Sequence, residues 1–186
     1  MKKTIFIFLL IGCSTLMAQS TWKVDAGHSN INFSISHLVI SEVTGNFGKF
    51  DIEAVANDAF SDPTFTVTIE TASISTSNER RDGHLKSDDF FAAEAHPTMT
   101  FKSNSYKKTG DKTFLLDGDF TIRGNTKPIQ LKGKLNGIIT DQRSKKLKAG
   151  IKLTGTIARK EFGVGGDNAA LGDDVEIIIN LEMAQQ

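Results

Sequence analysis

Apolar and polar side chains alternate with a period of two along most of the chain. Successive side chains of a β-strand point to opposite faces, so this period gives each segment one apolar face. The pattern predicts a series of half-buried strands around one interior. In the first half of the chain, the apolar positions of these segments are Ile31, Phe33, Ile35, Phe65, Val67, Ile69, Met99 and Phe101.

The second half of the chain continues this alternation, and turn signals separate its segments. Polar or Gly-containing turns occur at 109–111, 136–137, 141–146 and 163–168. No segment has the pattern of a long helix, so seven or eight antiparallel strands are expected, in a sandwich or a closed barrel. The inward positions are Phe114, Leu116, Phe120, Ile122, Ile129, Leu131, Leu135, Ala149, Ile151, Leu153, Ile157, Val175, Ile177, Ile179 and Leu181.

Residues 78–92 are the exception to the alternation and predict a short helical insertion. Asn78 can cap a helix, Glu79 suits the positive end of its first turn, and 79–86 contains no β-branched side chain. Ser87 is expected to cap a second turn. We expect the charged side chains of this insertion to face water.

The apolar side chains of the insertion, Leu85, Phe90 and Phe91, are expected to turn toward the interior. Pro97 biases the preceding residue away from helical backbone, so a strand should begin at Thr98. The insertion would then act as a lid between two strands.

Small side chains interrupt the inward series of Phe, Ile and Leu. The side chains of an eight-stranded barrel can just fill its interior, or they can leave room for one small ligand. We expect the small inward residues to leave a slot between larger ones. They are Val67, Gly118, Gly133, Ala149, Gly155 and Val175.

The first 18 residues have the pattern of a secretory signal peptide. Lys2 and Lys3 precede a short apolar run and a small-residue stretch that ends at Ala18. We expect cleavage after Ala18, a mature domain at 19–186 and a periplasmic location. The alternative is a lipoprotein that is lipidated at Cys13, the only cysteine, so the chain can form no internal disulfide.

Charge and hydropathy exclude two classes of partner. Loss of Lys2 and Lys3 with the leader leaves 20 basic against 22 acidic side chains, and this balance gives no broad attraction to nucleic acid or to anionic membranes. The apolar run of the leader is too short to span a bilayer, and we expect no transmembrane segment in the mature chain.

Motifs for metal binding and catalysis are weak. The spacing of His28, His37, His84 and His96 matches no zinc site, and no serine lies in a G-x-S-x-G nucleophile motif. We therefore predict no metal, no cofactor and no catalytic residue. The side chains of Arg80, Arg81, Arg123, Lys127 and Arg159 could gather around an anionic head group, or each could be an ordinary surface charge.

Several motifs together resemble one known family. They are "VDAGHSNINFSISHL" (24–38), "GNFGKF" (45–50), "SIST" (73–76), "RDGHLKSDDFF" (81–91), "HPTMTFKS" (96–103), "GDFTIRGNTKPI" (118–129) and "EFGVG" (161–165). In this order they resemble the YceI-like family of exported lipid-binding proteins. The resemblance extends from Trp22 to Leu181. Glu161 and Asn125 depart from it, because the family usually has aspartate at the first position and a hydrophobic residue at the second.

The resemblance implies an all-β fold, an extended eight-stranded antiparallel lipocalin-like barrel with the helical insertion at 78–92. It also implies a binding protein without enzyme chemistry, whose partner is a long-chain isoprenoid, quinone or similar apolar lipid held for carriage, storage or sensing. Formation of a homodimer is a further alternative. The alternatives are an enzyme that acts on an isoprenoid or small lipid through His84 with Asp82 or Asp89, and an envelope stress-related interaction module with a filled barrel.

The inward faces and the insertion supply the candidate ligand-binding residues. They are Ile31, Phe33, Ile35, Phe65, Val67, Ile69, Leu85, Phe90, Phe91, Met99, Phe101, Phe120, Ile122, Ile151, Leu153 and Ile177. Arg81 and His84 are candidates for contact with a polar head group, with hydrogen bonds that pin the insertion as the alternative role for each.

Overall fold

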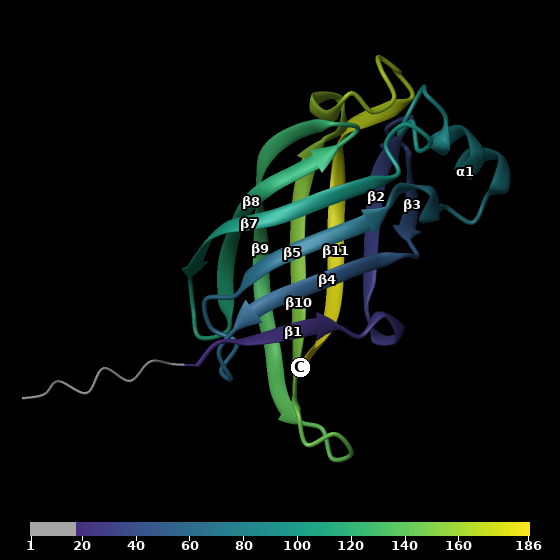
Figure 1. Ribbon diagram of the computed structural model, residues 1–186. Coiled ribbons are helices and arrows are strands. Elements are labelled where there is room, and N and C mark those ends of the chain that lie inside the picture. Colours follow the sequence, from purple (N-terminus) through teal and green to yellow (C-terminus); the bar gives the residue numbers. More distant parts are fainter. Residues whose placement is uncertain (1–17) are drawn as a thin grey trace, which may run out of the picture.

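The computed structural model describes residues 18–186, which form one antiparallel sheet of eleven strands (Figure 1). The expected signal peptide at 1–18, apart from Ala18, and the alternative lipid-anchor site at Cys13 lie outside the described residues. The eight strands of the closed ring are, in ring order, β1 (Ser20–Val24), β4 (Phe50–Ala56), β5 (Thr64–Glu70), β7 (Thr98–Lys108), β8 (Thr113–Ile122), β9 (Asn125–Thr140), β10 (Leu147–Ala158) and β11 (Leu171–Gln185).

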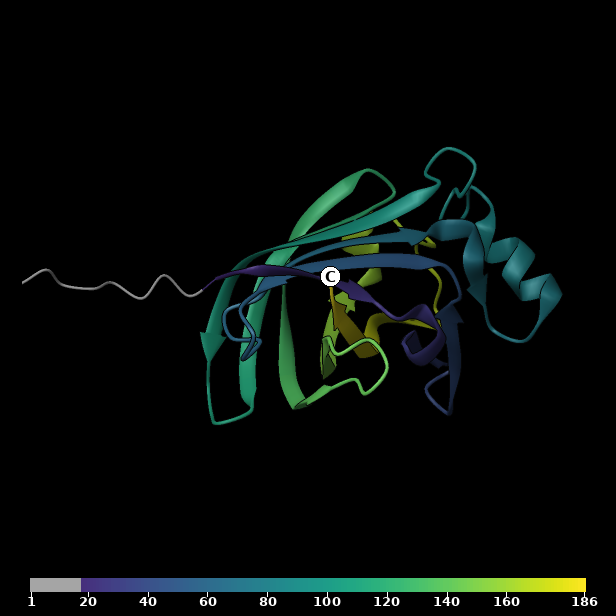
Figure 2. The same ribbon diagram turned by 60° about the horizontal axis from the view of Figure 1, so that its bottom comes forward.

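The long strand β11 closes the ring by changing partners along its length. Its last part pairs with β1, where Val24 lies opposite Met183. Its first part pairs with β2 (Asn30–His37), which continues into β3 (Ser41–Phe47) and the short β6 (Ile74–Ser75). The predicted all-β, eight-stranded antiparallel barrel is confirmed, and the sandwich is set aside. Figure 2 shows the ring from a second direction.

One end of the barrel, where β1 and the C-terminus lie (Figure 1), is filled by side chains. Trp22 is fully buried, its ring meets Phe60 edge-on at a centroid distance of 5.0 Å, and its Nε1–H donates to Ala56 O at 3.3 Å. Leu116, Ala149, Ile151 and Met183 are also almost completely buried. We call these seven residues the packed end.

The inward glycines are covered by neighbouring side chains, which contradicts the expectation that they leave a slot. A Cβ at Gly118 would lie 2.4 Å from the Phe101 ring, and one at Gly133 would lie 2.1 Å from the Phe114 ring. The Leu131 side chain covers Gly155 in the same way. Strand glycines often mark such close approach, so these positions accommodate large neighbours instead of a ligand.

The helical insertion contains α1 (Glu79–Lys86), as predicted. The side chain of Asn78 accepts a hydrogen bond from the Arg81 N–H at 3.0 Å and caps the first turn. Ser87 does not cap a second turn, because its hydroxyl donates back to His84 O at 2.8 Å and its N–H bonds the same carbonyl. Ser87 therefore ends α1. β7 begins at Thr98, as expected.

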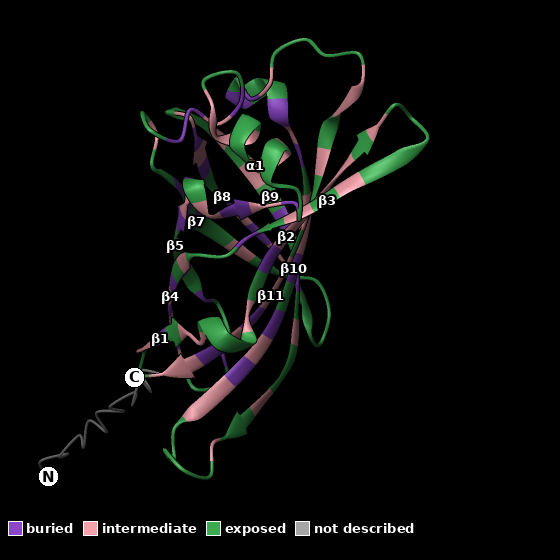
Figure 3. Ribbon diagram, turned by 90° about the vertical axis from the view of Figure 1, so that its right-hand side faces the viewer, coloured by how far each residue is buried: buried purple, intermediate pink, exposed green. Residues whose placement is uncertain are grey.

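The short 3-10 helices lie at the ends of strands: η1 (Ala26–His28), η2 (Thr71–Ser73) and η3 (Arg159–Phe162). The insertion with α1, the β2–β3 hairpin and the loop 163–170 lie together at the end of the barrel opposite the packed end (Figures 1 and 3). We call this the open end.

Candidate functional site

The barrel holds a cavity of about 560 Å³, within the range of about 300–1,000 Å³ that is usual for small-molecule sites. Most of its lining is aliphatic or aromatic. Several inward wall residues, Phe33, Ile35, Val175 and Ile177 among them, are only half-buried, because the space beside them is open. The barrel is therefore not filled by its own side chains.

All but one of the predicted ligand-binding residues line this cavity. They are Ile31, Phe33, Ile35, Phe65, Val67, Ile69, Leu85, Phe90, Phe91, Met99, Phe101, Phe120, Ile122, Leu153 and Ile177. Ile151 does not line it. Ile151 is 1% exposed and belongs to the packed end, where it lies opposite Leu181 and Leu135 on the neighbouring strands. The inward direction of its side chain was predicted correctly. Its position along the barrel axis was not predicted, because that position depends on how far the packed end extends.

The cavity also has walls that the candidate residues did not include. Ile129, Leu131, Ile157, Val175, Ile179 and Leu181 lie on predicted inward faces and line the cavity. Phe47, Ile52 and Ile74 line it as well, and they are brought there by the pairing of β3 with β2 and β6 and of β4 with β5. Phe47 is central, because its ring lies 5.8 Å from Phe33 and 5.9 Å from Phe91.

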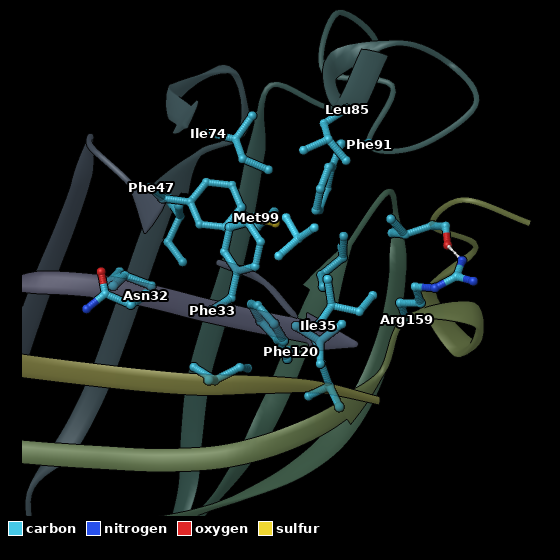
Figure 4. A pocket seen from close by; sticks show the side chains of 18 of the residues that line it. Asn32, Phe33, Ile35, Phe47, Ile74, Leu85, Phe91, Met99, Phe120 and Arg159 are labelled. Carbon is cyan, nitrogen blue, oxygen red and sulfur yellow. Dashed lines mark hydrogen bonds between the residues drawn. The ribbon is translucent and has the colours of Figure 1, made fainter. Parts of the chain in front are cut away.

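The insertion forms a cover over this space. Leu85 and Phe91 extend toward Phe47 and Ile74 in Figure 4, so their side chains form the upper wall of the cavity. Phe90 is held differently, because its ring is 9% exposed and lies over Gly165, where a Cβ would be 2.6 Å from it. The lid described from the sequence is therefore present.

The two candidate head-group residues lie at the rim beside α1. Arg81 lines the cavity, and its guanidinium donates to Thr76 Oγ1 at 2.7 Å and to Thr76 O at 2.9 Å, which pins the insertion to the chain before it. His84 is exposed, and its Nε2 lies 3.2 Å from Asp89 Oδ2. Both residues also border a small polar depression with Asn78 and Arg80.

The proposed proton-transfer pair is not enclosed. Asp82 accepts hydrogen bonds from the Thr76 N–H at 2.8 Å and the Thr76 hydroxyl at 2.5 Å, so it is committed to the start of α1. In the His84–Asp89 contact, the His84 side chain is 59% exposed and the Asp89 side chain is 78% exposed. Enzymes strengthen the electrostatic effect of catalytic groups by excluding water from them, whereas both side chains of this pair are exposed to water.

The basic residues do not gather around one point. Arg123 donates to Phe90 O at 2.9 Å and to Gly163 O at 2.5 Å, and thereby ties the insertion to the loop 163–170. Arg159 lines the cavity and is 4% exposed. Arg80 is exposed on α1. Arg123 and Arg159 therefore both bind carbonyl groups of the loop 163–170, whereas Arg80 lies apart on α1.

Arg159 is a buried cation at the open end, and no local pattern in the sequence predicted its burial. Its Nε donates to Gly172 O at 2.8 Å, and its Nη1 donates to Val164 O at 2.7 Å (Figure 4) and Gly166 O at 3.1 Å. Its Nη2 is buried and has no acceptor among the described residues. The guanidinium holds the loop by its carbonyl groups.

A polar cluster lies outside the cavity, beside η1. His28 Nδ1 lies 3.0 Å from Asp25 Oδ2, and the Lys148 ammonium lies 2.6 Å from Glu182 Oε1. The hydrogen bond with Asp25 raises the pKa of His28, and the same bond lowers the pKa of Asp25. Asp25, His28 and Glu182 are close enough to hold a metal ion, but the Lys148 ammonium already forms ion pairs with both carboxylates.

The one α-helix of the described residues has 8 residues, and no helix there has the length and hydropathy that a membrane span requires.

Comparisons with known proteins give one consistent result. Protein YceI of Escherichia coli O157:H7 is 35% identical over 195 residues and covers 100% of both chains. A crystal structure of the Campylobacter jejuni YCEI protein is 34% identical, with a TM-score of 0.73 over 82% of this chain and 90% of that one. A polyisoprenoid binding domain from Saccharophagus degradans shares the fold, at 15% identity and a TM-score of 0.65 over 89% and 98% of the two chains.

The model of the YceI-like domain matches residues 22–183, which includes all or most of every strand of the ring, the insertion and the cavity walls described above. Together with the relatives that share about a third of its residues, this match shows that the chain belongs to the YceI-like family.

Proposed function

We propose that this protein is an exported binding protein that holds a long apolar ligand, a polyisoprenoid, quinone or similar lipid, inside the barrel for carriage, storage or sensing. The observation that carries the proposal is the apolar cavity of about 560 Å³ under the α1 insertion. The name of the structurally similar Saccharophagus degradans domain, a polyisoprenoid binding domain, supports the ligand class.

Apolar contact alone can hold such a ligand. Burial of one CH₂ group contributes about 0.8 kcal/mol, so a five-carbon isoprene unit contributes roughly 4 kcal/mol. Three or four buried units then exceed the lower part of the ~4–15 kcal/mol that association costs in lost freedom of motion. No covalent bond or strong ion pair is required.

The wall residues named above are proposed to contact the hydrocarbon chain, and the rim is proposed to receive its polar end. Arg81 and His84 border both the cavity and the polar depression beside it. A head group that leaves the cavity beside α1 would meet them first. The exposed His84–Asp89 pair gives no support for the enzyme alternative.

The leader at 1–18 supports the proposed export to the periplasm, with cleavage after Ala18. The decisive experiment is extraction and identification of the lipid that remains in the protein after gentle isolation from its native compartment. Mass spectrometry should detect a long apolar molecule in stoichiometric amount. Protein that is consistently empty and that takes up no prenyl lipid in solution contradicts the proposal.

Two neighbouring residues of β11 give a matched pair of variants. Ile177 lines the cavity, whereas Ile178 points outward and is 37% exposed. Ile177→Trp should fill the space and weaken uptake of a fluorescent prenyl chain at least about tenfold, the loss expected when one isoprene unit or less is displaced. Ile178→Trp should bind as the unchanged protein does. Equal uptake by both variants would place the ligand elsewhere.

A further inference from the structure

The β2–β3 hairpin ends in three consecutive large apolar residues that contact water. Leu38, Val39 and Ile40 are 53%, 92% and 86% exposed. In the described residues only Ile139 and Ile178 are other large apolar side chains with comparable exposure, and each is isolated on a strand. Figure 3 shows the outer part of this hairpin as an exposed projection at the open end. We call residues 38–40 the hairpin tip.

The backbone of the hairpin tip is unfavourable for the residues that occupy it. Leu38 has φ 53° and Val39 has φ 64°, and the Ile40 N–H bonds His37 O at 3.3 Å across the turn. The last strand pair is His37 with Ser41, so the loop has three residues, and its two successive positive φ angles suit Asn and Gly, whereas a β-branched residue is a rare occupant. All three side chains are exposed, so burial within the described chain does not account for this choice of residues.

The tip adjoins the entrance to the cavity. The flanking residues His37 and Ser41 both line the cavity. The Leu38 N–H donates to Ala170 O at 2.8 Å, which joins the tip to the loop 163–170. Asn168 and Ala170 of that loop also line the cavity. An apolar partner that covered the tip would therefore also face the entrance.

We propose that the hairpin tip inserts into the interfacial region of a phospholipid bilayer and sets the cavity entrance against the membrane. The inference rests on the proposed function, since an apolar ligand could then pass between bilayer and barrel without crossing water. Three side chains are far too few for the roughly 1,200–2,000 Å² of a standard protein interface. A bilayer requires no such area or shape.

The charge around the tip indicates which kind of membrane surface it suits. From Ser29 to Gly48 the chain contains no Lys or Arg, and Glu42 is the nearest charged residue after the tip. The hairpin itself therefore gives no electrostatic attraction to anionic lipid. Binding should be weak and reversible, comparable to a single myristoyl chain with a partition constant of about 10⁴ M⁻¹.

The test measures flotation of the purified protein with phosphatidylcholine vesicles and with vesicles that contain one quarter phosphatidylglycerol. Leu38→Asn, Val39→Gly and Ile40→Thr together retain a turn that suits the hairpin, so the variant should fold. It should reduce vesicle binding at least about tenfold, given the transfer free energy of three apolar side chains. The matched control combines Ile139→Thr and Ile178→Thr, which remove the other exposed apolar residues, and it should bind as the unchanged protein does.

Two outcomes overturn the proposal. One is vesicle binding that is equally strong in the tip variant, or vesicle binding that occurs only when phosphatidylglycerol is present. The other is absence of vesicle binding in the unchanged protein, with a dimer that the tip variant converts to a monomer in sedimentation, since the tip would then contact a second copy. Uptake of a prenyl ligand from cyclodextrin is measured in parallel and should be unaffected by the tip variant. Failure of uptake in the unchanged protein would instead contradict the proposed function and leave vesicle binding as a separate result.

Discussion

At the packed end, Trp22 is fully buried and meets Phe60 edge-on at 5.0 Å, whereas at the open end Val39 is 92% exposed with φ at 64°. In the first region, burial, packing and local geometry favour the same structure. In the second, large apolar residues face water or open space, and a cation, Arg159, is buried. The difference indicates that the packed end stabilises the fold, so the open end can keep unfilled space and exposed apolar residues.

The strongest test of this comparison removes one large side chain from each end. Trp22→Ala should lower the free energy of unfolding by about 3–5 kcal/mol, because it leaves a cavity in a filled region. Phe91→Ala should cost clearly less, because Phe91 is half-buried and borders space that already exists. Urea unfolding measures both. Similar losses at the two sites would show that the open end is packed as firmly.

A second test adds a methyl group at each end. At Gly133 a Cβ would lie 2.1 Å from the Phe114 ring, which is buried and does not border the cavity, so Gly133→Ala should destabilise by about 1–3 kcal/mol. At Gly155 it would lie 2.6 Å from the end of Leu131, which lines the cavity and can turn into it. Gly155→Ala should therefore cost less than about 1 kcal/mol, with reduced freedom of the unfolded chain offsetting part of the strain. Thermal unfolding of the two variants gives the order, and the reverse order contradicts it.

The strands and the insertion could be predicted because their signals are local. Alternation identifies the inward face of β10, and Asn78 identifies the start of α1. The depth of a residue along the barrel is not local. Ile151 and Leu153 share one face of β10, yet only Leu153 lines the cavity, because the packed end reaches Ile151.

Features that depend on distant partners were beyond the sequence pattern. Gly118 was expected to leave space, but the side chain that occupies it, Phe101, comes from the neighbouring strand. The wall residue Phe47 reaches the cavity through pairing of β3 with β2 and β6. A turn with Leu38 and Val39 at positive φ has no sequence signal, since neither residue favours it.

The strain at the open end can be measured directly. Leu38→Asn with Val39→Gly places residues at the hairpin tip that adopt positive φ readily. The double variant should raise the free energy of unfolding by about 1 kcal/mol or more, since a left-handed backbone costs other residues roughly 1–2 kcal/mol each. Calorimetry checks the melting temperature. A lower melting temperature would mean that the apolar tip stabilises the hairpin through contacts of its own.

The smallest effect concerns the charged cluster beside η1, near the packed end. The pKa of His28 is raised from 6.5 by its hydrogen bond with Asp25, so its contribution to stability is complete below pH 6.5 and is lost as the pH rises through the folded pKa. The pKa of Asp25 is lowered from 3.8, so its contribution is present above pH 3.8 and is lost as the pH falls through the folded pKa. Both groups lie at the surface, so the change in stability should be small.

Titration of the His28 ring by NMR tests this directly. The midpoint should lie above 6.5, and Asp25→Asn should bring it back toward that value. A midpoint at or below 6.5 in the unchanged protein would show that the Asp25–His28 hydrogen bond does not persist in solution.

The change of partners along β11 governs when the barrel can form. Its pairing joins Trp22 to Gln185, and it also supplies the neighbour of β2 and of β10. A polypeptide that emerges amino end first therefore has no complete cylinder until β11 is available. Contacts between such remote positions form slowly, so closure waits for β11, and this late strand locks the much earlier β1 in place.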